Sequence, residues 1–266
     1  MRRRLPQIVG LLTPESLAAP DGPAALRACD VLEIRADLFG EGRPGALVGE
    51  VRALFPDAPL LFSVRLRRDG GAWPDERAGD RLPLFEAALR SGEVSWVDVE
   101  ADEEAAVRAL APLRAESSAR LLVSNHRWSA PASAGECERE FARALALGPD
   151  GVKLVWTLRD GDDDRPLLEF LEARRDDPRL MACFAMGEGG RGSRLLAPLA
   201  GVPWSYGFVG SGAPAPGQWR VSEMRDCFAE IAPPGGENGL NRLKSDLERW
   251  EKSRFSTFGR ATLEDA

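Results

Sequence analysis

The sequence predicts an α/β protein, a single (β/α)8 barrel with a helical extension at its C-terminus. Short apolar or alternating segments recur along the 266 residues, and segments with helical periodicity separate them. Strands that alternate with helices form parallel sheets, and eight such units in about this length are typical of a barrel. A doubly wound open sheet is the alternative, but no GxGxxG motif follows the first predicted strand. We assign residues 1–232 to the barrel and 233–266 to the extension.

The predicted strands are short and rich in β-branched, aliphatic and aromatic residues. In chain order they cover residues 8–12, 31–37, 60–64, 95–100, 121–125, 152–156, 180–186 and 204–209. The predicted helices are rich in Ala and Leu or repeat apolar residues with helical spacing. They cover residues 24–29, 45–54, 82–90, 103–114, 135–147, 166–175, 194–199 and 222–231. After a Pro- and Gly-rich break, an amphipathic helix is predicted over 240–250, which we expect to dock on the barrel or to contact a second subunit.

Composition argues against several classes of function. The net charge of −7 and the lack of a basic stripe with interleaved aromatic residues argue against a nucleic-acid-binding protein. No stretch approaches the ~20 apolar residues that span a bilayer, and the apolar run near the N-terminus is too short for a signal peptide. The four cysteines are scattered and the chain has one histidine, so we expect no metal site. Free thiols suit a reducing compartment, which predicts a cytoplasmic protein.

Charged residues occupy alternate positions of several predicted strands, and alternate residues of a strand share one face. Glu33, Arg35 and Asp37 fall on one face of the second strand, with Leu32 and Ile34 on the other. Because the helix-facing side of a barrel strand is apolar, the charged set must point into the lumen. The same rule directs further polar residues inward: Ser63, Arg65, Asp98, Glu100, Ser124, His126 and Lys153. They lie near the C-terminal ends of their strands, where barrel active sites are found.

Two rare residue types indicate the chemistry of this lumen. Lys153 is one of only three lysines, and it lies in an apolar segment. A lysine there can lose its proton, which an arginine cannot do. His126 is the only histidine and lies on the neighbouring strand, at a sheet spacing of about 4.8 Å. Burial and the guanidinium groups of Arg35 and Arg65 would lower the lysine pKa, which leaves an amine able to attack a ketone. The alternative interpretation is a structural ion-pair network among Glu33, Arg35, Arg65, Asp98 and Glu100.

Seven ordered segments carry a resemblance to a known family. They are Glu33-Ile-Arg35-Ala-Asp37, Ser63-Val-Arg65 followed by Gly70-Gly71, Val97-Asp-Val-Glu100, Ser124-Asn-His126, Val152-Lys153, Ala185-Met186-Gly187 with Ser193-Arg194, and Pro216-Gly217-Gln218. Over about residues 7–230 the chain resembles type I 3-dehydroquinate dehydratase, the imine-forming family of the shikimate pathway. The resemblance implies syn elimination of water from 3-dehydroquinate to give 3-dehydroshikimate, with no metal or dissociable cofactor. A homodimer is common in the family.

The resemblance also implies a role for each site residue. Lys153 would form the imine with the substrate's C3 ketone, and His126 would remove the C2 proton and protonate the departing C1 hydroxyl. Asp69 would be the third catalytic residue, as the partner of His126. Arg194 would bind the substrate carboxylate through its planar fork. Further residues would bind the ring or its hydroxyl groups, or would order the site. They are Glu33, Arg35, Arg65, Gln218, Met186 and Ser211.

Two departures from the family concern single side chains of the site. A glutamate is usual at the position of Asp69, whose side chain is one methylene shorter. Asp69 would therefore reach His126 directly or through a water, or Glu100 would take over this role. Phe184 stands where a methionine is common.

Two further departures concern segments. The loop 209–218 is one residue longer than usual, and Pro214 replaces a serine for which Ser211 would have to substitute. That loop normally closes over the substrate. The N-terminus leaves no room for the hairpin that plugs the barrel bottom in many relatives, and we expect the 240–250 helix to contribute there.

Two other functions stay open on the sequence. A catalytically impaired barrel would bind a small cyclic carboxylate without turnover, although binding alone requires neither Lys153 nor His126. Another imine-forming lyase, such as an aldolase for a phosphorylated sugar, would bind phosphate at a glycine-rich turn after the seventh strand. Residues 187–192 could form that turn, but Glu188 would repel a phosphate.

Overall fold

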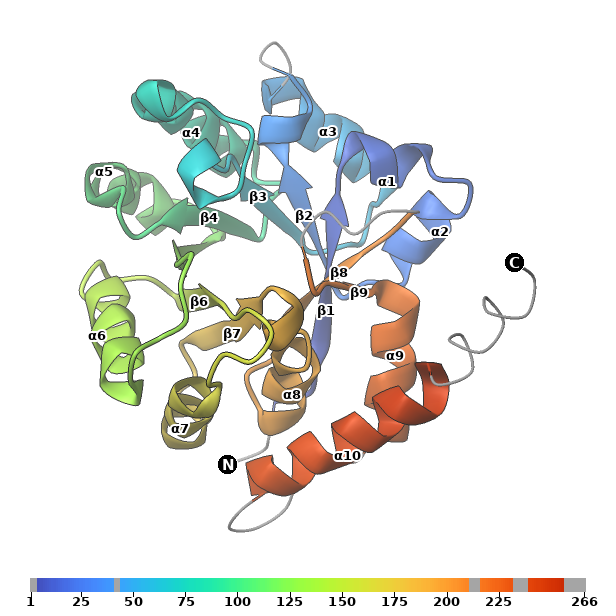
Figure 1. Ribbon diagram of the computed structural model, residues 1–266. Coiled ribbons are helices and arrows are strands. Elements are labelled where there is room, and N and C mark those ends of the chain that lie inside the picture. The colour runs from blue at the N-terminus through green and yellow to red at the C-terminus, as the bar shows by residue number, and fades with distance from the viewer. Residues whose placement is uncertain (1–3, 41–43, 211–215, 232–238, 256–266) are drawn as a thin grey trace.

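Eight parallel strands succeed one another around a curled sheet in the computed structural model, which describes residues 4–40, 44–210, 216–231 and 239–255 (Figure 1). Strand β1 pairs with both β2 and β8, and a short ninth strand pairs with β8. This consecutive order confirms the barrel and excludes the doubly wound sheet, whose strand order reverses at a switch point. The strands are β1 (Gln7–Leu12), β2 (Val31–Arg35), β3 (Leu60–Ser63), β4 (Trp96–Glu100), β5 (Arg120–His126), β6 (Gly151–Thr157), β7 (Leu180–Met186), β8 (Trp204–Phe208) and β9 (Trp219–Arg220).

The barrel closes between β7 and β8 through side chains. Among the described residues no backbone pairing joins these two strands, because the sheet runs from β7 at one edge to β9 at the other. The rings of Phe184 on β7 and Tyr206 on β8 nevertheless lie 5.8 Å apart between centroids. Aromatic packing therefore bounds the lumen on this side.

Helices surround the sheet (Figure 1). Two of them begin at capping residues: Thr13 forms a capping box with Ser16, and the Ser133 side chain accepts a hydrogen bond from the backbone of Glu136. The helices are α1 (Pro14–Ala18), α2 (Gly22–Arg27), α3 (Pro44–Leu54), α4 (Leu82–Ser91), α5 (Glu104–Ala115), α6 (Ala134–Leu145), α7 (Arg165–Arg174), α8 (Ser193–Ala200), α9 (Val221–Glu230) and α10 (Gly239–Phe255).

Two apolar clusters lie on opposite faces of the sheet. The outer cluster, between strands and helices, contains Leu32 and Ile34 of β2. The inner cluster fills the lumen and contains Val31 of the same strand together with Leu61 and Leu122. The alternation inferred from the sequence is therefore confirmed, because the charged residues of β2 share the phase of Val31 and not that of Leu32.

The end of the barrel opposite to the carboxyl ends of the strands is closed by aromatic rings and by the N-terminal segment. Trp96 and Trp204 meet edge to face with centroids 5.0 Å apart. Arg4 donates hydrogen bonds of 2.9–3.1 Å to the carbonyl oxygens of Arg175, Asp177 and Pro178, just before β7. The expectation that the C-terminal helix contributes at this end is wrong, since α10 lies outside α8 and α9 (Figure 1).

Several boundaries differ from the sequence-based expectation. Strand β2 ends at Arg35, two residues early, because Ala36–Leu38 forms a 3₁₀ turn that returns Asp37 toward the guanidinium of Arg35. Helix α1 and strand β9 were not predicted. The proposed boundary at residue 232 lies outside the described residues.

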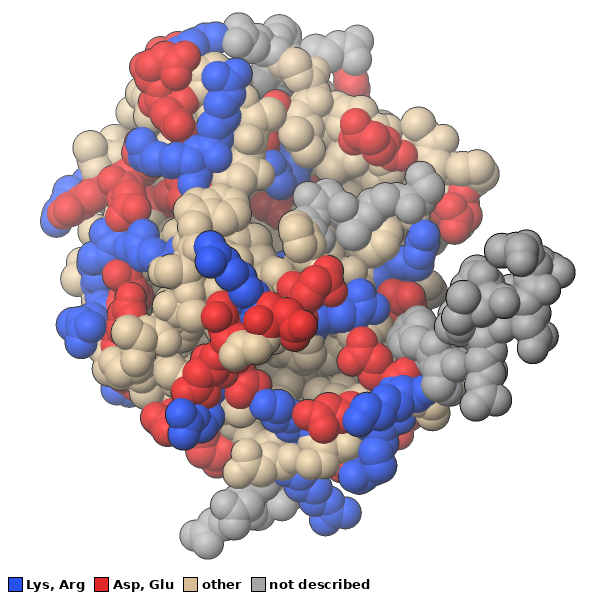
Figure 2. All heavy atoms as spheres, viewed as in Figure 1, with Lys and Arg blue, Asp and Glu red and all other residues tan. Residues whose placement is uncertain are grey.

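The surface carries interleaved acidic and basic side chains on the face shown in Figure 2. Acidic side chains gather over the loop between β6 and α7, which contains Asp160, Asp162, Asp163 and Asp164. Within the described ranges, no helix has both the length and the apolar composition needed to cross a membrane.

Candidate active site

A pocket of about 300 Å³ opens at the carboxyl ends of the strands, where barrel enzymes bind their substrates. Strands β1, β2, β5, β6, β7 and β8 and the loop after β3 contribute to its walls. Ser211, which the sequence also proposed for this site, lies outside the described residues. The other proposed residues all line the pocket: Glu33, Arg35, Arg65, Asp69, His126, Lys153, Met186, Arg194 and Gln218.

Lys153 is buried inside the barrel, with only 5% of the residue exposed. Its Nζ lies 3.4 Å from Asp98 Oδ2 and 4.0 Å from the centroid of the Tyr206 ring. Burial lowers the pKa of Lys153, and Asp98 and Glu33 oppose this effect without cancelling it. The amine is therefore easier to deprotonate than an ordinary lysine, although a carboxylate lies next to it.

A β-bulge lies beside this lysine. Val152 pairs with Leu180 on β7, but Lys153 pairs with Ala182, so that Met181 is an extra residue on β7. Bulges bend a strand and redirect neighbouring side chains, and they are frequent next to active sites.

Arg65 is the centre of a buried ion network. Its guanidinium contacts Asp98 Oδ2 at 2.5 Å, Glu100 Oε1 at 3.3 Å and Glu33 Oε1 at 3.8 Å. It also donates to the hydroxyl of Ser124 at 2.8 Å. Although burial alone would lower the pKa of Arg65, the three carboxylates raise it above its ordinary value, so its charge is permanent. The ion network considered from the sequence is therefore present around Arg65, but Arg35 pairs with Asp37 instead of joining it. The network leads to Lys153 through Asp98.

His126 is on β5, with its ring lining the pocket. It pairs in register with Val155, whereas Lys153 pairs with Ser124, so the two functional side chains are offset by two residues along adjacent strands. Burial lowers the pKa of His126 well below its usual value, and the positive charges of Arg65 and Lys153 lower it further. The imidazole is therefore neutral at neutral pH and can accept a proton.

Asp69 follows β3 in the 3₁₀ turn Arg67–Asp69 and lines the same pocket. Burial, followed by the charge of Glu100, raises the pKa of Asp69 to about 6. Its Oδ2 and the Nδ1 of His126 are both buried without a hydrogen-bond partner among the described residues. Glu100 is engaged elsewhere, since one oxygen contacts Arg65 and the other lies 2.7 Å from Arg81 Nη1. Asp69 has only a longer contact with an arginine, because Arg68 Nε lies 3.6 Å from its Oδ2.

Arg194, near the start of α8, is buried with its Cζ 4.5 Å from the centroid of Phe184. Burial lowers the pKa of Arg194 to about 10, and no carboxylate pairs with it within the described part of the chain. Its Nε lacks a hydrogen-bond partner there. The phenylalanine that replaces the common methionine therefore offers an aromatic face to this guanidinium.

Gln218 and Arg35 differ in how many of their polar atoms already have hydrogen-bond partners. Gln218 Nε2 donates to the carbonyl of Tyr206 at 3.3 Å, while Gln218 Oε1 is buried without a partner among the described residues. Arg35 makes two bonds to Asp37, at 2.9 and 2.7 Å, and Asp37 also accepts from the backbone of Ala72. Arg35 is therefore held at the pocket wall as half of a neutral pair.

Four residues of the site were missed or given no role in the sequence analysis. Tyr206 lies under the lysine amine, and the same alternation rule applied to β8 would have found it. Asp98 was placed in the lumen, but its contact with Lys153 depends on the strand register. Arg81 ends the 3₁₀ helix Asp75–Arg81 and Trp128 lies in the loop after β5, and neither segment has a periodicity that indicates direction. Trp128 lines the pocket and its Nε1 donates to the carbonyl of Arg68 at 2.6 Å.

Comparisons with known proteins agree with one another. The 3-dehydroquinate dehydratase of Listeria monocytogenes serovar 1/2a is 30% identical over 206 residues, which are 74% of this chain and 79% of that protein. That of Dehalococcoides mccartyi is 29% identical over 218 residues, 82% of this chain and 90% of that protein. A match of 28% identity to the pentafunctional AROM polypeptide of Zygosaccharomyces rouxii covers 79% of this chain but only 13% of that polypeptide.

Solved structures give the same result. The crystal structure of 3-dehydroquinate dehydratase from Geobacillus kaustophilus superimposes with a TM-score of 0.72 at 26% identity, covering 84% of this chain and 90% of that chain. The type I enzyme of Clostridium difficile, at 21% identity and a TM-score of 0.72, supports the fold. The type I 3-dehydroquinase family model matches residues 17–232. This chain therefore belongs to the type I 3-dehydroquinase family.

Proposed function

We propose that the protein dehydrates 3-dehydroquinate to 3-dehydroshikimate through an imine on Lys153. The observation that carries this proposal is the placement of a buried amine with a lowered pKa in one pocket with the chain's only imidazole. Simple binding of a carboxylate would need neither group. Family membership and the names of the relatives support the choice of substrate.

The proposed steps conserve atoms and charge. The amine of Lys153 attacks the C3 ketone, and loss of one water gives the imine. His126 removes a proton from C2, and the electron pair is delocalised toward the imine nitrogen as an enamine. The C1 hydroxyl then leaves as water with a proton returned by His126. Hydrolysis of the imine consumes one water, so the overall reaction releases a single water molecule.

Arg194 is proposed to bind the substrate carboxylate. Among the pocket arginines, Arg65 is shared by three carboxylates and Arg35 is paired with Asp37. Arg194 is the buried guanidinium at this pocket with no carboxylate among the described residues. An anionic substrate would therefore offset the cost of keeping a buried cation.

The imine is tested by trapping. The protein is incubated with 3-dehydroquinate, reduced with borohydride and analysed by peptide mass spectrometry. We expect a stable adduct on Lys153, and neither adduct nor turnover in Lys153→Ala. The matched control is Lys252→Ala, which removes an exposed lysine of α10 and should leave the adduct unchanged. Turnover by Lys153→Ala at the wild-type rate would rule out the imine mechanism.

The role of His126 is tested separately. In His126→Ala we expect the adduct to form while turnover falls by roughly 100- to 10,000-fold, the usual contribution of a general base. Unchanged turnover would remove His126 from the mechanism. A wild-type protein that binds the substrate but gives neither adduct nor product would instead be a binding module, and an adduct formed only with a phosphorylated sugar would favour an aldolase.

The proposal includes a homodimer in the cytoplasm. Both come from the resemblance to the family, and the four free cysteines suit a reducing compartment. Light scattering of the purified protein measures the subunit number.

A further inference from the structure

Helix α10 (Gly239–Phe255) lies beyond residue 232, where the match to the family model ends. It is nevertheless packed firmly against the barrel. Its apolar stripe of Leu240, Leu243, Leu247 and Trp250 is buried, and each of these residues is at most 8% exposed. This docked helix therefore lies outside the part of the chain that the family model matches.

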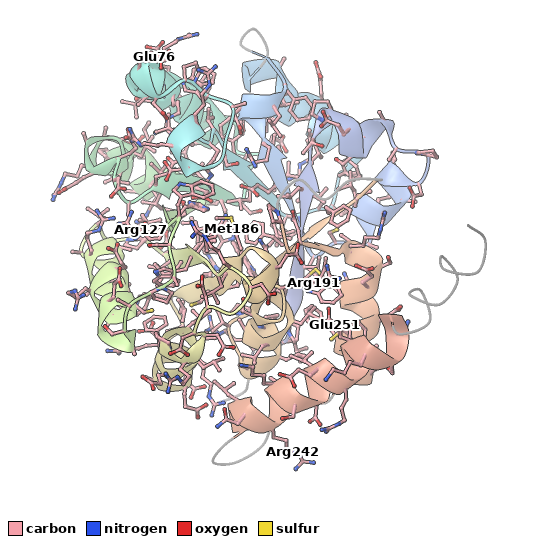
Figure 3. The ribbon with its side chains drawn as sticks, viewed as in Figure 1. Glu76, Arg127, Met186, Arg191, Arg242 and Glu251 are labelled. Carbon is pink, nitrogen blue, oxygen red and sulfur yellow. The ribbon has the colours of Figure 1, made fainter. Side chains whose placement is uncertain are left out.

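The first contact of α10 is with the loop between β7 and α8. Glu251 Oε1 lies 3.1 Å from Arg191 Nε, and Figure 3 shows the two side chains meeting between that loop and the helix. The guanidinium carbon of Arg191 lies 3.5 Å from the centroid of the Trp219 ring. Arg191 is thus held between an acidic group of α10 and an aromatic face of β9.

The second contact is with β9 itself. The Trp250 and Trp219 rings lie 6.0 Å apart between centroids, at an interplanar angle of 59°. Trp219 Nε1 donates to the carbonyl of Arg191 at 3.0 Å, which ties β9 to the β7–α8 loop. Trp250 is itself anchored, because its Nε1 donates to Glu230 Oε2 at 2.9 Å. The helix therefore holds two segments, 187–191 and 216–220, that already contact each other.

Both segments lead directly into the pocket. The carbonyl of Arg191 also accepts a hydrogen bond of 3.3 Å from the backbone of Arg194, and Gln218 immediately precedes Trp219. Gly187 donates to the carbonyl of Pro216 at 3.2 Å. Arg194 and Gln218 each present to the pocket a buried polar atom that lacks a partner among the described residues.

We infer that α10 is a positioning element of the pocket, and that it acts through Arg191 and Trp219 on Arg194 and Gln218. The inference rests on the proposed function, since it assigns to α10 the orientation of the two groups that would bind the substrate. Small displacements of such groups weaken binding steeply, because directed hydrogen bonds tolerate little misplacement. None of the described α10 residues lines the pocket.

The test uses full-length variants of the Arg191–Glu251 pair: Glu251→Ala, Glu251→Gln, Arg191→Gln and the Arg191→Gln/Glu251→Ala double variant. Matched controls are Asp246→Ala, which pairs only with Arg242 and Arg249 of the same helix among the described residues, and Arg242→Gln, an exposed residue near the other end of α10 (Figure 3). The readouts are kcat, KM and hydrogen–deuterium exchange of peptides that cover 187–194 and 216–220.

We expect faster exchange in both peptides for Glu251→Ala and Arg191→Gln. KM should rise about fivefold with kcat within about twofold, which is the scale of a partly exposed ion pair. Glu251→Gln should recover part of the loss, because its amide oxygen can still accept from Arg191. The double variant should be no worse than the stronger single variant, since the two residues act as one unit.

Exchange and KM equal to those of the controls would overturn the inference. So would faster exchange with unchanged KM, which would mean that α10 stabilises the loops without orienting the binding groups. Equal changes in the controls would indicate general destabilisation of α10 and would also reject it. If the wild-type protein does not dehydrate 3-dehydroquinate, the proposed function fails, and the exchange of the two peptides alone decides whether α10 orders them.

Discussion

At the residue scale, the pocket contains two ionisable groups whose environments push their pKa values in opposite directions. Burial and Glu100 raise the pKa of Asp69 to about 6, whereas burial and nearby cations lower the pKa of His126 well below its usual value. At neutral pH Asp69 is therefore an anion and His126 is neutral. A neutral imidazole and an anionic carboxylate in one pocket suit a base that must accept a proton.

Asp69→Asn should remove one limb of the pH profile. In the wild type, kcat/KM should rise as the pH increases through about 6, because Asp69, the proposed partner of His126, gains its charge there and would favour protonation of the imidazole. In the variant this limb should disappear and the plateau should be lower, by roughly 10-fold. Rate profiles from about pH 5 to about pH 9 measure both effects. A limb at the same pH in the variant would assign it to another group.

The same substitution should stabilise the fold at higher pH. A raised pKa means that the folded state binds the Asp69 proton more tightly than the unfolded chain does, so stability falls as the pH rises from about 4 through about 6. Asp69→Asn should therefore unfold at a higher temperature than the wild type at about pH 8. Near pH 4 the two proteins should unfold at similar temperatures. An advantage of the variant at that low pH would show that titration of Asp69 is not the cause.

At the element scale, the connection from β3 to α4 is held rigid by backbone packing. A Cβ on Gly71 would lie 2.0 Å from the carbonyl oxygen of Arg65, and no side-chain rotation can relieve that overlap. Gly71 also donates to the carbonyl of Leu66 at 2.8 Å. From the β5 side, Trp128 donates to Arg68. These contacts fix the short turn that carries Asp69.

Gly71→Ala should displace this turn. We expect a loss of about 1–3 kcal/mol of stability from the overlap of the new methyl group with the Arg65 carbonyl, and a fall in kcat because Asp69 moves with the turn. Gly79→Ala is the matched control, since a Cβ there would meet no atom within 4 Å. Thermal unfolding and steady-state kinetics measure the two effects. Wild-type kcat in Gly71→Ala would show that the position of Asp69 is not critical.

At the scale of the whole molecule, the two ends of the barrel have different tasks. The buried charges lie near the carboxyl ends of the strands. At the opposite end the rings of Trp96 and Trp204 pack together, and Arg4 donates hydrogen bonds to backbone carbonyls. Barrels commonly separate chemistry and stability in this way. The N-terminal segment should therefore matter for stability and not for catalysis.

Arg4→Gln tests this separation. Loss of hydrogen bonds from a charged donor should cost about 1–3 kcal/mol, which lowers the unfolding temperature by roughly 2–8 °C in a protein of this size. The values of kcat and KM should stay unchanged. Arg242→Gln, which removes an exposed arginine of α10, should not change the unfolding temperature. A change in KM in Arg4→Gln would mean that the two ends are coupled.

The strand pattern and the identity of the inward-facing residues could be predicted because both follow from local chemistry. A period of two on a strand separates Glu33 from Leu32 without reference to any other part of the chain. The same period applied to β8 would have included Tyr206. Arg81 and Trp128 could not be predicted, since they come from connections between strands and helices, whose course depends on packing against the rest of the fold.

The sequence by itself determined the barrel, its family and a single lysine and histidine in the lumen, because periodicity and rare residue types are local properties. Only the tertiary structure decided which charges neutralise one another. Arg65 contacts three carboxylates, and the two oxygens of Glu100 contact Arg65 and Arg81. Arg194 has no carboxylate partner among the described residues. The tertiary structure also placed α10 against the pocket loops instead of the barrel bottom. These outcomes depend on strand register and helix docking, which bring together residues far apart in the chain.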